Sequence, residues 1–144
     1  AVLLAVGLAG CTGGDPMPVP TYTPTASSSP GAITTEPELR PGQSASANQQ
    51  FFDQLIDVYA INNGMGTSRG IVDALVAGGF EKSDIEVTPD TTAINIAADS
   101  IVVSVRIKGE CLIGQLAPAD HSSEIAPLLG TGRCLVGETL PIDW

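Results

Sequence analysis

A long stretch rich in proline, threonine and serine runs from residue 12 to residue 43 and limits how much of the chain can fold. Those three residue types supply 16 of its 32 positions, and large apolar side chains are rare in it. Such a segment cannot bury enough apolar surface to offset the entropy lost on ordering. We therefore expect a disordered linker over residues 11–43 and a single folded domain over residues 44–144.

The charge of the chain argues against nucleic acid as a partner. The 144 residues carry 6 Lys+Arg against 16 Asp+Glu, a formal net charge of −10. A chain with this excess of carboxylates repels a phosphate backbone. Hydrophobic residues make up 43% of the chain, which is enough for a packed core. No apolar run approaches the roughly 20 residues that span a bilayer.

The first ten residues are apolar or small and carry no charge. Their length and composition match the hydrophobic region of a secretory signal, so we expect residues 1–10 to be part of a signal peptide and to take no part in the fold. This segment leads into Leu8-Ala9-Gly10-Cys11. The motif resembles the lipobox of bacterial lipoproteins, in which the cysteine thiol receives a diacylglycerol group and the chain is cut just before it.

This resemblance implies that Cys11 is the lipidated residue. A cleaved secretory signal followed by an unrelated cysteine, or an internal helix, is the alternative. Two or three acyl chains, at about 0.8 kcal/mol per buried CH₂, hold a protein on a membrane essentially permanently. The expected localisation is the extracytoplasmic face of the cell membrane, with the linker holding the domain away from the bilayer. The composition of the linker also resembles that of O-glycosylated stalks.

Two amphipathic helices are predicted at the start of the domain. Ser46, with a glutamine three residues later, has the form of a capping box, and apolar residues then recur at helical spacing until Asn63-Gly64. The second helix would be capped by Thr67 or Ser68 and would end at Gly78-Gly79. The apolar positions of the two helices are Phe52, Leu55, Ile56 and Tyr59, then Ile71, Val72, Leu75 and Val76.

Beyond the helices the apolar residues alternate, which is typical of strands. A longer connection is expected over residues 118–130, with one helical turn at residues 123–129, and Trp144 is expected to cover part of the core. Helices followed by strands predict an α+β domain, in which an N-terminal helical hairpin packs on one face of a small, mostly antiparallel sheet. Strands are expected at residues 85–87, 101–107, 111–113 and 132–137, with a weaker candidate at residues 92–98.

With Cys11 assigned to lipid, two cysteines remain in a compartment that permits disulfides, and we predict that Cys111 and Cys134 pair. Each lies in a predicted strand, and neighbouring strands bring Cα atoms to the separation that a disulfide needs. A redox-active pair is the alternative, but no C-x-x-C motif is present. A zinc site of Cys111, His121 and Cys134 lacks a fourth ligand at recognisable spacing. We expect a structural disulfide that stabilises the domain.

Three further patterns have simpler explanations than a functional site. Asp120-His121-Ser122-Ser123 contains an acid, a base and a nucleophile, yet neighbouring side chains point in different directions, so we expect an exposed polar loop. Gly64-Met65-Gly66-Thr67 follows a predicted helix, which favours a helix–helix turn over a phosphate loop. Four acidic residues lack the EF-hand pattern, which favours a solvated surface over a calcium site. These residues are Asp84, Glu86, Asp90 and Asp99.

Several short segments are distinctive: Phe51-Phe52-Asp53-Gln54-Leu55, Gly79-Phe80, residues 99–105, the two cysteine segments and Pro141-Ile142-Asp143-Trp144. With them, the domain resembles a small uncharacterised domain found in actinobacterial cell-envelope lipoproteins. The resemblance covers nearly all of residues 44–144. It implies a cell-envelope location and the domain boundaries, but no activity and no site residues.

We expect a membrane-anchored extracytoplasmic lipoprotein whose domain is a non-catalytic module that binds an envelope protein or wall component. The first rival is a small cell-envelope hydrolase, which would need a cleft with convergent carboxylates or an activated serine. The second rival is a structural or assembly subunit. The sequence indicates no catalytic residue, no metal and no cofactor, and it specifies no oligomeric state.

Overall fold

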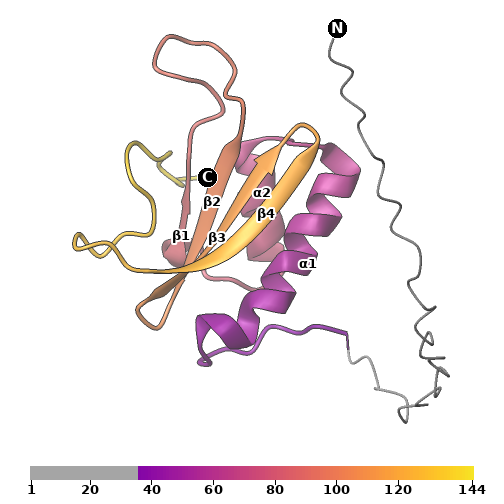
Figure 1. The fold of residues 1–144 in the computed structure, drawn as a ribbon, viewed down its shortest axis with the longest axis vertical. Helices are drawn as coiled ribbons and strands as arrows, with labels where there is room; N and C mark the ends of the chain where they lie inside the picture. The colour runs from indigo at the N-terminus through magenta and orange to yellow at the C-terminus, as the bar shows by residue number, and fades with distance from the viewer. Residues whose placement is uncertain (1–35) are drawn as a thin grey trace, which may run out of the picture. The chain divides into compact units, whose positions relative to one another are not determined.

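The computed structural model describes residues 36–144, which fold as two helices and one sheet (Figure 1). The predicted signal peptide, Cys11 and the linker up to residue 35 lie outside the described residues. Four antiparallel strands follow the helices in the order β1-β2-β3-β4. The predicted α+β class is therefore confirmed. The elements are α1 (Ala45–Asn63), α2 (Ser68–Ala77), a 3₁₀ turn η1 (Lys82–Asp84), β1 (Ile85–Val87), β2 (Ile101–Ile107), β3 (Glu110–Ala117) and β4 (Asp120–Pro127).

Serine and threonine side chains define where the two helices begin. The prediction that Ser46 caps α1 is wrong: the cap is Ser44, whose hydroxyl accepts a hydrogen bond of 3.3 Å from the Ala47 N–H. Thr67 caps α2 in the same way, since its hydroxyl accepts from the Gly70 N–H at 3.0 Å. Each bond satisfies one of the backbone donors that a helix leaves unpaired in its first turn. Neither helix in the described part of the chain has the length and apolar character needed to cross a membrane.

The core lies between the helices and one face of the sheet. Helix α1 contributes Phe52 and Ile56, and both are buried as predicted. The ring of Phe52 reaches β3 because Gly114 has no side chain there: a Cβ at Gly114 would lie 3.2 Å from Cζ of Phe52. Most of the other fully buried apolar residues come from α2 and from β1, β2 and β3, including Ile71, Val72, Leu75, Val87, Ile101, Val103, Val105, Leu112 and Leu116.

The prediction of a long connection with a helical turn over residues 118–130 is wrong. Residues 120–127 form β4, which pairs with β3 along its whole length. Strand β4 lies at the edge of the sheet, so its burial alternates only weakly and five of its eight residues are exposed. The sequence DHSSEIAP therefore lacks the apolar alternation that predicts a strand, and pairing with β3 decides its conformation.

Two predicted strands are absent from the described residues. Residues 132–137 are irregular, with positive φ angles at Gly132 (77°) and Gly137 (89°) that extended strands do not adopt. Residues 92–98 form a loop whose one bridge joins Thr91 to Ala97. Each segment has apolar residues, but neither pairs with a strand of the sheet. In Figure 1 the segment after β4 runs out to the side of β1, and the loop that contains residues 92–98 projects beyond the end of the sheet.

The packed part of the chain begins ahead of residue 44. Leu39 is half-buried against the core. The neighbouring Arg40 donates its backbone N–H to the side-chain oxygen of Asn48 at 2.7 Å, and the Asn48 amide donates back to the Arg40 carbonyl at 3.2 Å. Asn48 is only 1% exposed, so this reciprocal pair satisfies a buried amide. We call residues 36–43 the entry segment.

Candidate functional site

The predicted disulfide between Cys111 and Cys134 is present, with the two Cα atoms 5.6 Å apart. Cys111 lies in β3, on the sheet face opposite the helices, and both cysteines are buried. Cys134, in contrast to the prediction, lies in the irregular segment after β4. The bond therefore joins this segment to the outer face of the sheet and does not link two strands.

Glu86 holds the same segment through its carboxylate. One oxygen accepts the backbone N–H of Cys134 at 3.1 Å, and the other accepts that of Leu135 at 3.0 Å. Nε of Arg133 lies 3.5 Å from the second oxygen. In β1 the side chains of Ile85 and Val87 point into the core, so Glu86 must point to the opposite face, where the segment passes. The carboxylate thus has a structural role.

Replacing Glu86 by alanine is expected to lower the free energy of unfolding by about 2–3 kcal/mol, because two buried backbone donors would lose a charged acceptor. Equilibrium urea unfolding measures this change. Glu138→Ala is the matched control, since Glu138 is exposed and should shift the unfolding midpoint by less than about 0.5 kcal/mol. Equal effects of the two substitutions would show that Glu86 does not anchor the segment.

Two of the other three acidic residues considered for calcium also have separate partners, and the third, Asp99, is exposed. Asp84 pairs with Arg106 at 2.8 Å. Asp90 accepts hydrogen bonds from the backbone N–H and the hydroxyl of Ser68, at 2.5 and 2.8 Å, and so ties the loop after β1 to the start of α2. Within residues 36–144, no group of three histidine, cysteine or acidic side chains is placed to hold a metal ion.

The Asp120-His121-Ser122-Ser123 segment lies in β4, where alternate residues point to opposite faces. His121 and Ser123 face α1. Nε2 of His121 lies 2.6 Å from Oδ1 of Asp57, and the Ser123 hydroxyl donates to Asp53. The four-residue step from Asp53 to Asp57 rises about 6 Å and two strand residues span about 6.7 Å, so the two pairs run side by side.

These contacts do not form a relay from acid to base to nucleophile. His121 and Ser123 each bond a different aspartate, Asp57 and Asp53, so neither pair links a base to a nucleophile. The zinc alternative also finds no support, because Cys111 and Cys134 bond each other while His121 binds Asp57. The two aspartates therefore join α1 to β4.

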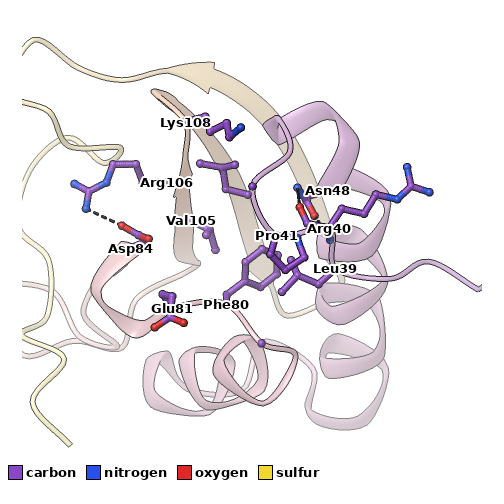
Figure 2. Close-up of a pocket in the computed structure, with 13 residues that line it drawn as sticks. Leu39, Arg40, Pro41, Asn48, Phe80, Glu81, Asp84, Val105, Arg106 and Lys108 are labelled. Carbon is purple, nitrogen blue, oxygen red and sulfur yellow. Dashed lines mark hydrogen bonds and ion pairs between the residues drawn. The ribbon is translucent and has the colours of Figure 1, made fainter.

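A surface pocket of about 310 Å³ lies where the entry segment meets the end of β2 (Figure 2). Its apolar part is formed by Leu39, Phe80, Val105 and Ile107. Phe80 packs edge-on against Phe52 at a centroid distance of 6.1 Å, which fixes the ring in the pocket wall. This concave surface combines apolar side chains with a small number of polar groups, which is typical of a binding site.

Charged side chains surround the apolar part of the pocket. Arg106 is bound to Asp84, and Glu81 lies nearer to Phe80 (Figure 2). Lys108 is exposed at the pocket rim, and it takes part in none of the four ion pairs in the described part of the chain. Figure 2 shows the guanidinium of Arg40 turned away from the pocket. Lys108 is therefore a cation available to a partner.

Sequence reasoning did not find this pocket. Its lining comes from the entry segment, the start of α1, residues 79–84 and the end of β2, and these segments meet only in the folded domain. The entry segment was assigned to the linker on composition alone. The alternation of apolar residues predicts that Val105 and Ile107 face the core. It does not predict that a pocket lies at this end of the strand.

The structure confirms two predictions, one about the connection between the helices and one about Trp144. Gly64-Met65-Gly66-Thr67 connects α1 to α2, with positive φ at both glycines, so it is a helix–helix turn. Trp144 is half-buried against the core, and its indole N–H donates to Asp73 at 3.0 Å while Arg69 lies 5.2 Å from the ring centroid. Trp144 therefore covers part of the core, as predicted.

The fold and the pocket define a small disulfide-bonded α+β domain, in which a helical hairpin covers one face of a four-stranded antiparallel sheet. A family model described as Domain of unknown function (DUF6993) matches residues 56–138. Because this match spans more than half of the chain, the chain belongs to that family. No curated protein and no solved structure matches the chain.

Proposed function

We propose that this chain is a membrane-anchored extracytoplasmic lipoprotein, attached through lipid on Cys11, and that its domain is a non-catalytic binding module of the cell envelope. The observation that carries the proposal is the disulfide between Cys111 and Cys134. Such bonds persist in oxidising compartments and are rare in the cytosol. The bond also uses two of the three cysteines in the chain, and the third lies in the lipobox-like motif.

The motif and the domain support this proposal from different parts of the chain. Leu8-Ala9-Gly10-Cys11 follows an uncharged apolar segment and precedes the Pro/Thr/Ser-rich linker, which is the order that a lipid anchor and tether require. The resemblance of the domain to those of actinobacterial cell-envelope lipoproteins agrees with that location. The pocket, with its apolar wall and the available Lys108, supports binding as the role of the domain.

Replacing Cys11 by serine tests the anchor in the natural full-length protein. We expect the serine variant to move from the membrane fraction to the soluble fraction, because a hydroxyl cannot take the place of the thiol that carries the diacylglycerol group. Membrane sedimentation after a high-salt wash measures the change, and mass spectrometry of the peptide that begins at residue 11 measures the lipid.

Thr12→Ala is the matched control for this experiment, since it alters the adjacent residue and keeps the thiol of Cys11. The control should remain with the membranes. The proposed lipid anchor is wrong if the Cys11→Ser variant sediments with the membranes as the natural protein does. It is also wrong if the natural protein carries an unmodified Cys11.

A further inference from the structure

The loop between β1 and β2 presents two large apolar side chains to solvent. Ile94 is 74% exposed and Ile96 is 59% exposed, whereas Ile56, Ile71, Ile85 and Ile101 are buried in the core. Figure 1 shows this loop projecting beyond the end of the sheet. We call residues 94–96 the tip. Apolar side chains at an exposed tip gain hydrophobic free energy only when a partner removes them from water.

The tip is held in one conformation by the loop around it. The Thr92 N–H donates to the Ile96 carbonyl at 2.8 Å, and the Asn95 N–H donates to the Thr92 carbonyl at 2.9 Å. Asn95 has a positive φ of 58°, which asparagine tolerates better than most residues. The base of the loop is fixed by Asp90, which binds Ser68 at the start of α2. A preorganised tip loses little conformational entropy on docking.

The tip and the pocket lie at opposite ends of β2. Strand β2 follows the loop that carries the tip, and it ends at Ile107, which lines the pocket together with the next residue, Lys108. Its seven residues separate the two sites by roughly 20 Å. A tip therefore cannot reach the pocket of its own chain. It can reach the pocket of a second copy that lies end to end with the first.

The two sites are complementary in polarity and charge. The pocket offers an apolar wall that includes Phe80 and Ile107, and its volume of about 310 Å³ accommodates branched aliphatic side chains. Asp99 is exposed at the base of the tip loop, while Lys108 is exposed at the pocket rim. Neither takes part in an ion pair within residues 36–144. In end-to-end contact this carboxylate and this ammonium group are the charges available to pair across the interface.

The geometry points to self-association in which the Ile94-Asn95-Ile96 tip of one copy occupies the pocket of the next. This inference rests on the proposed role of the pocket as a binding site and names a second copy of the chain as its occupant. Because tip and pocket are different surfaces, the contact is head-to-tail, and repetition of it produces open chains of copies.

The charge of the protein favours a second copy over a membrane surface as the partner of the tip. A chain with a net charge of −10 is repelled by anionic phospholipid headgroups, and the tip itself carries no basic residue. The same net charge disfavours contacts between two copies in most orientations. Head-to-tail contact is the orientation that brings Lys108 of one copy to Asp99 of the other.

The contact is small, so we expect weak association in solution. Two isoleucine side chains bury far less than the roughly 1,000 Å² of a stable interface, and an expected Kd is on the order of 0.1 mM. Anchoring copies on one membrane raises their effective concentration and would extend the chains there. Weak contact in solution is thus compatible with assembly on a surface.

Sedimentation velocity of the purified full chain carrying Cys11→Ser tests the inference without any lipid. The weight-average sedimentation coefficient should rise between about 10 µM and about 1 mM protein. With Ile94→Asp, the same rise in sedimentation coefficient should require a protein concentration at least tenfold higher. Ile61→Asp is the matched control, because Ile61 is 80% exposed on α1 and its replacement introduces the same charge; this control should associate as the parent chain does.

A mixture of two defective variants distinguishes head-to-tail contact from a symmetric dimer. Ile94→Asp keeps an intact pocket, and Lys108→Glu keeps an intact tip. Each variant alone should associate at least tenfold more weakly than the parent chain, whereas the mixture should form one-to-one dimers and nothing larger. The double variant Asp99→Lys with Lys108→Glu should associate again, since the charges are exchanged.

Several results would overturn this inference. One is a parent chain that stays monomeric up to about 1 mM. Another is an effect of Ile61→Asp equal to that of Ile94→Asp, and a third is a mixture that stays monomeric. Ile94-dependent co-sedimentation of a monomeric chain with phosphatidylglycerol vesicles would identify a lipid surface as the occupant instead. Because these chains carry no lipid, a failure of the Cys11 anchor would leave all of these measurements unchanged.

Discussion

Replacing Cys111 and Cys134 together by alanine is expected to lower the free energy of unfolding by about 3.5 kcal/mol, and the thermal midpoint by about 15–25 °C. The bond closes a loop with a sequence separation of 23 residues, and its loss releases that constraint on the unfolded chain. Net stabilities of domains of this size are only about 5–15 kcal/mol, so the loss is a large fraction of the total.

Urea unfolding of the double alanine variant measures this effect, and reduction of the parent chain by dithiothreitol should reproduce most of it. Alanine is preferred to serine here because both cysteines are buried and a buried hydroxyl would add its own cost. Hydrogen exchange should show the amides of Cys134 and Leu135 losing protection first. An unfolding midpoint that reduction leaves unchanged would mean that the disulfide does not support the domain.

Replacing Phe52 by alanine is expected to lower the free energy of unfolding by about 4 kcal/mol. The ring is fully buried, packs edge-on against Phe80 and fills the space above Gly114. Its removal would leave a cavity between α1 and the sheet that the rigid strands cannot close. The measurement is equilibrium urea unfolding, and the m-value should stay constant if the variant still unfolds in two states.

Val58→Ala is the matched control, because Val58 lies on the same helix and is 52% exposed. It should change the free energy of unfolding by less than about 0.5 kcal/mol, so it reports any effect of helix propensity. A loss for Phe52→Ala no greater than that of Val58→Ala would contradict the packing of α1 on β3 at Gly114.

Elements whose own residues repeat at a clear period were predictable. The alternation of Ile101, Val103, Val105 and Ile107 identified β2 and its buried face, and helical spacing identified α1 and α2. In these elements the periodicity of the sequence matches the face that is buried, since each element packs one continuous apolar face against the same core.

Elements that depend on a neighbouring strand were not predictable. Strand β4 is polar and at an edge, so its conformation comes from pairing with β3 and from the contacts of His121 and Ser123 with α1. Residues 132–137 have apolar side chains but lie across the outer sheet face, where the disulfide and Glu86 hold them. Local composition carries no information about either arrangement.

The cysteine count and the expected assignment of Cys11 to lipid were enough to predict which two residues form the bond, although the reason given, two adjacent strands, was wrong for Cys134. Periodicity was enough to predict the α+β class and most of the core. The pocket, the role of Glu86 and the projecting tip emerged only from tertiary structure. Each brings together residues far apart in the chain, and a linear pattern records spacing along the backbone but not contact across space.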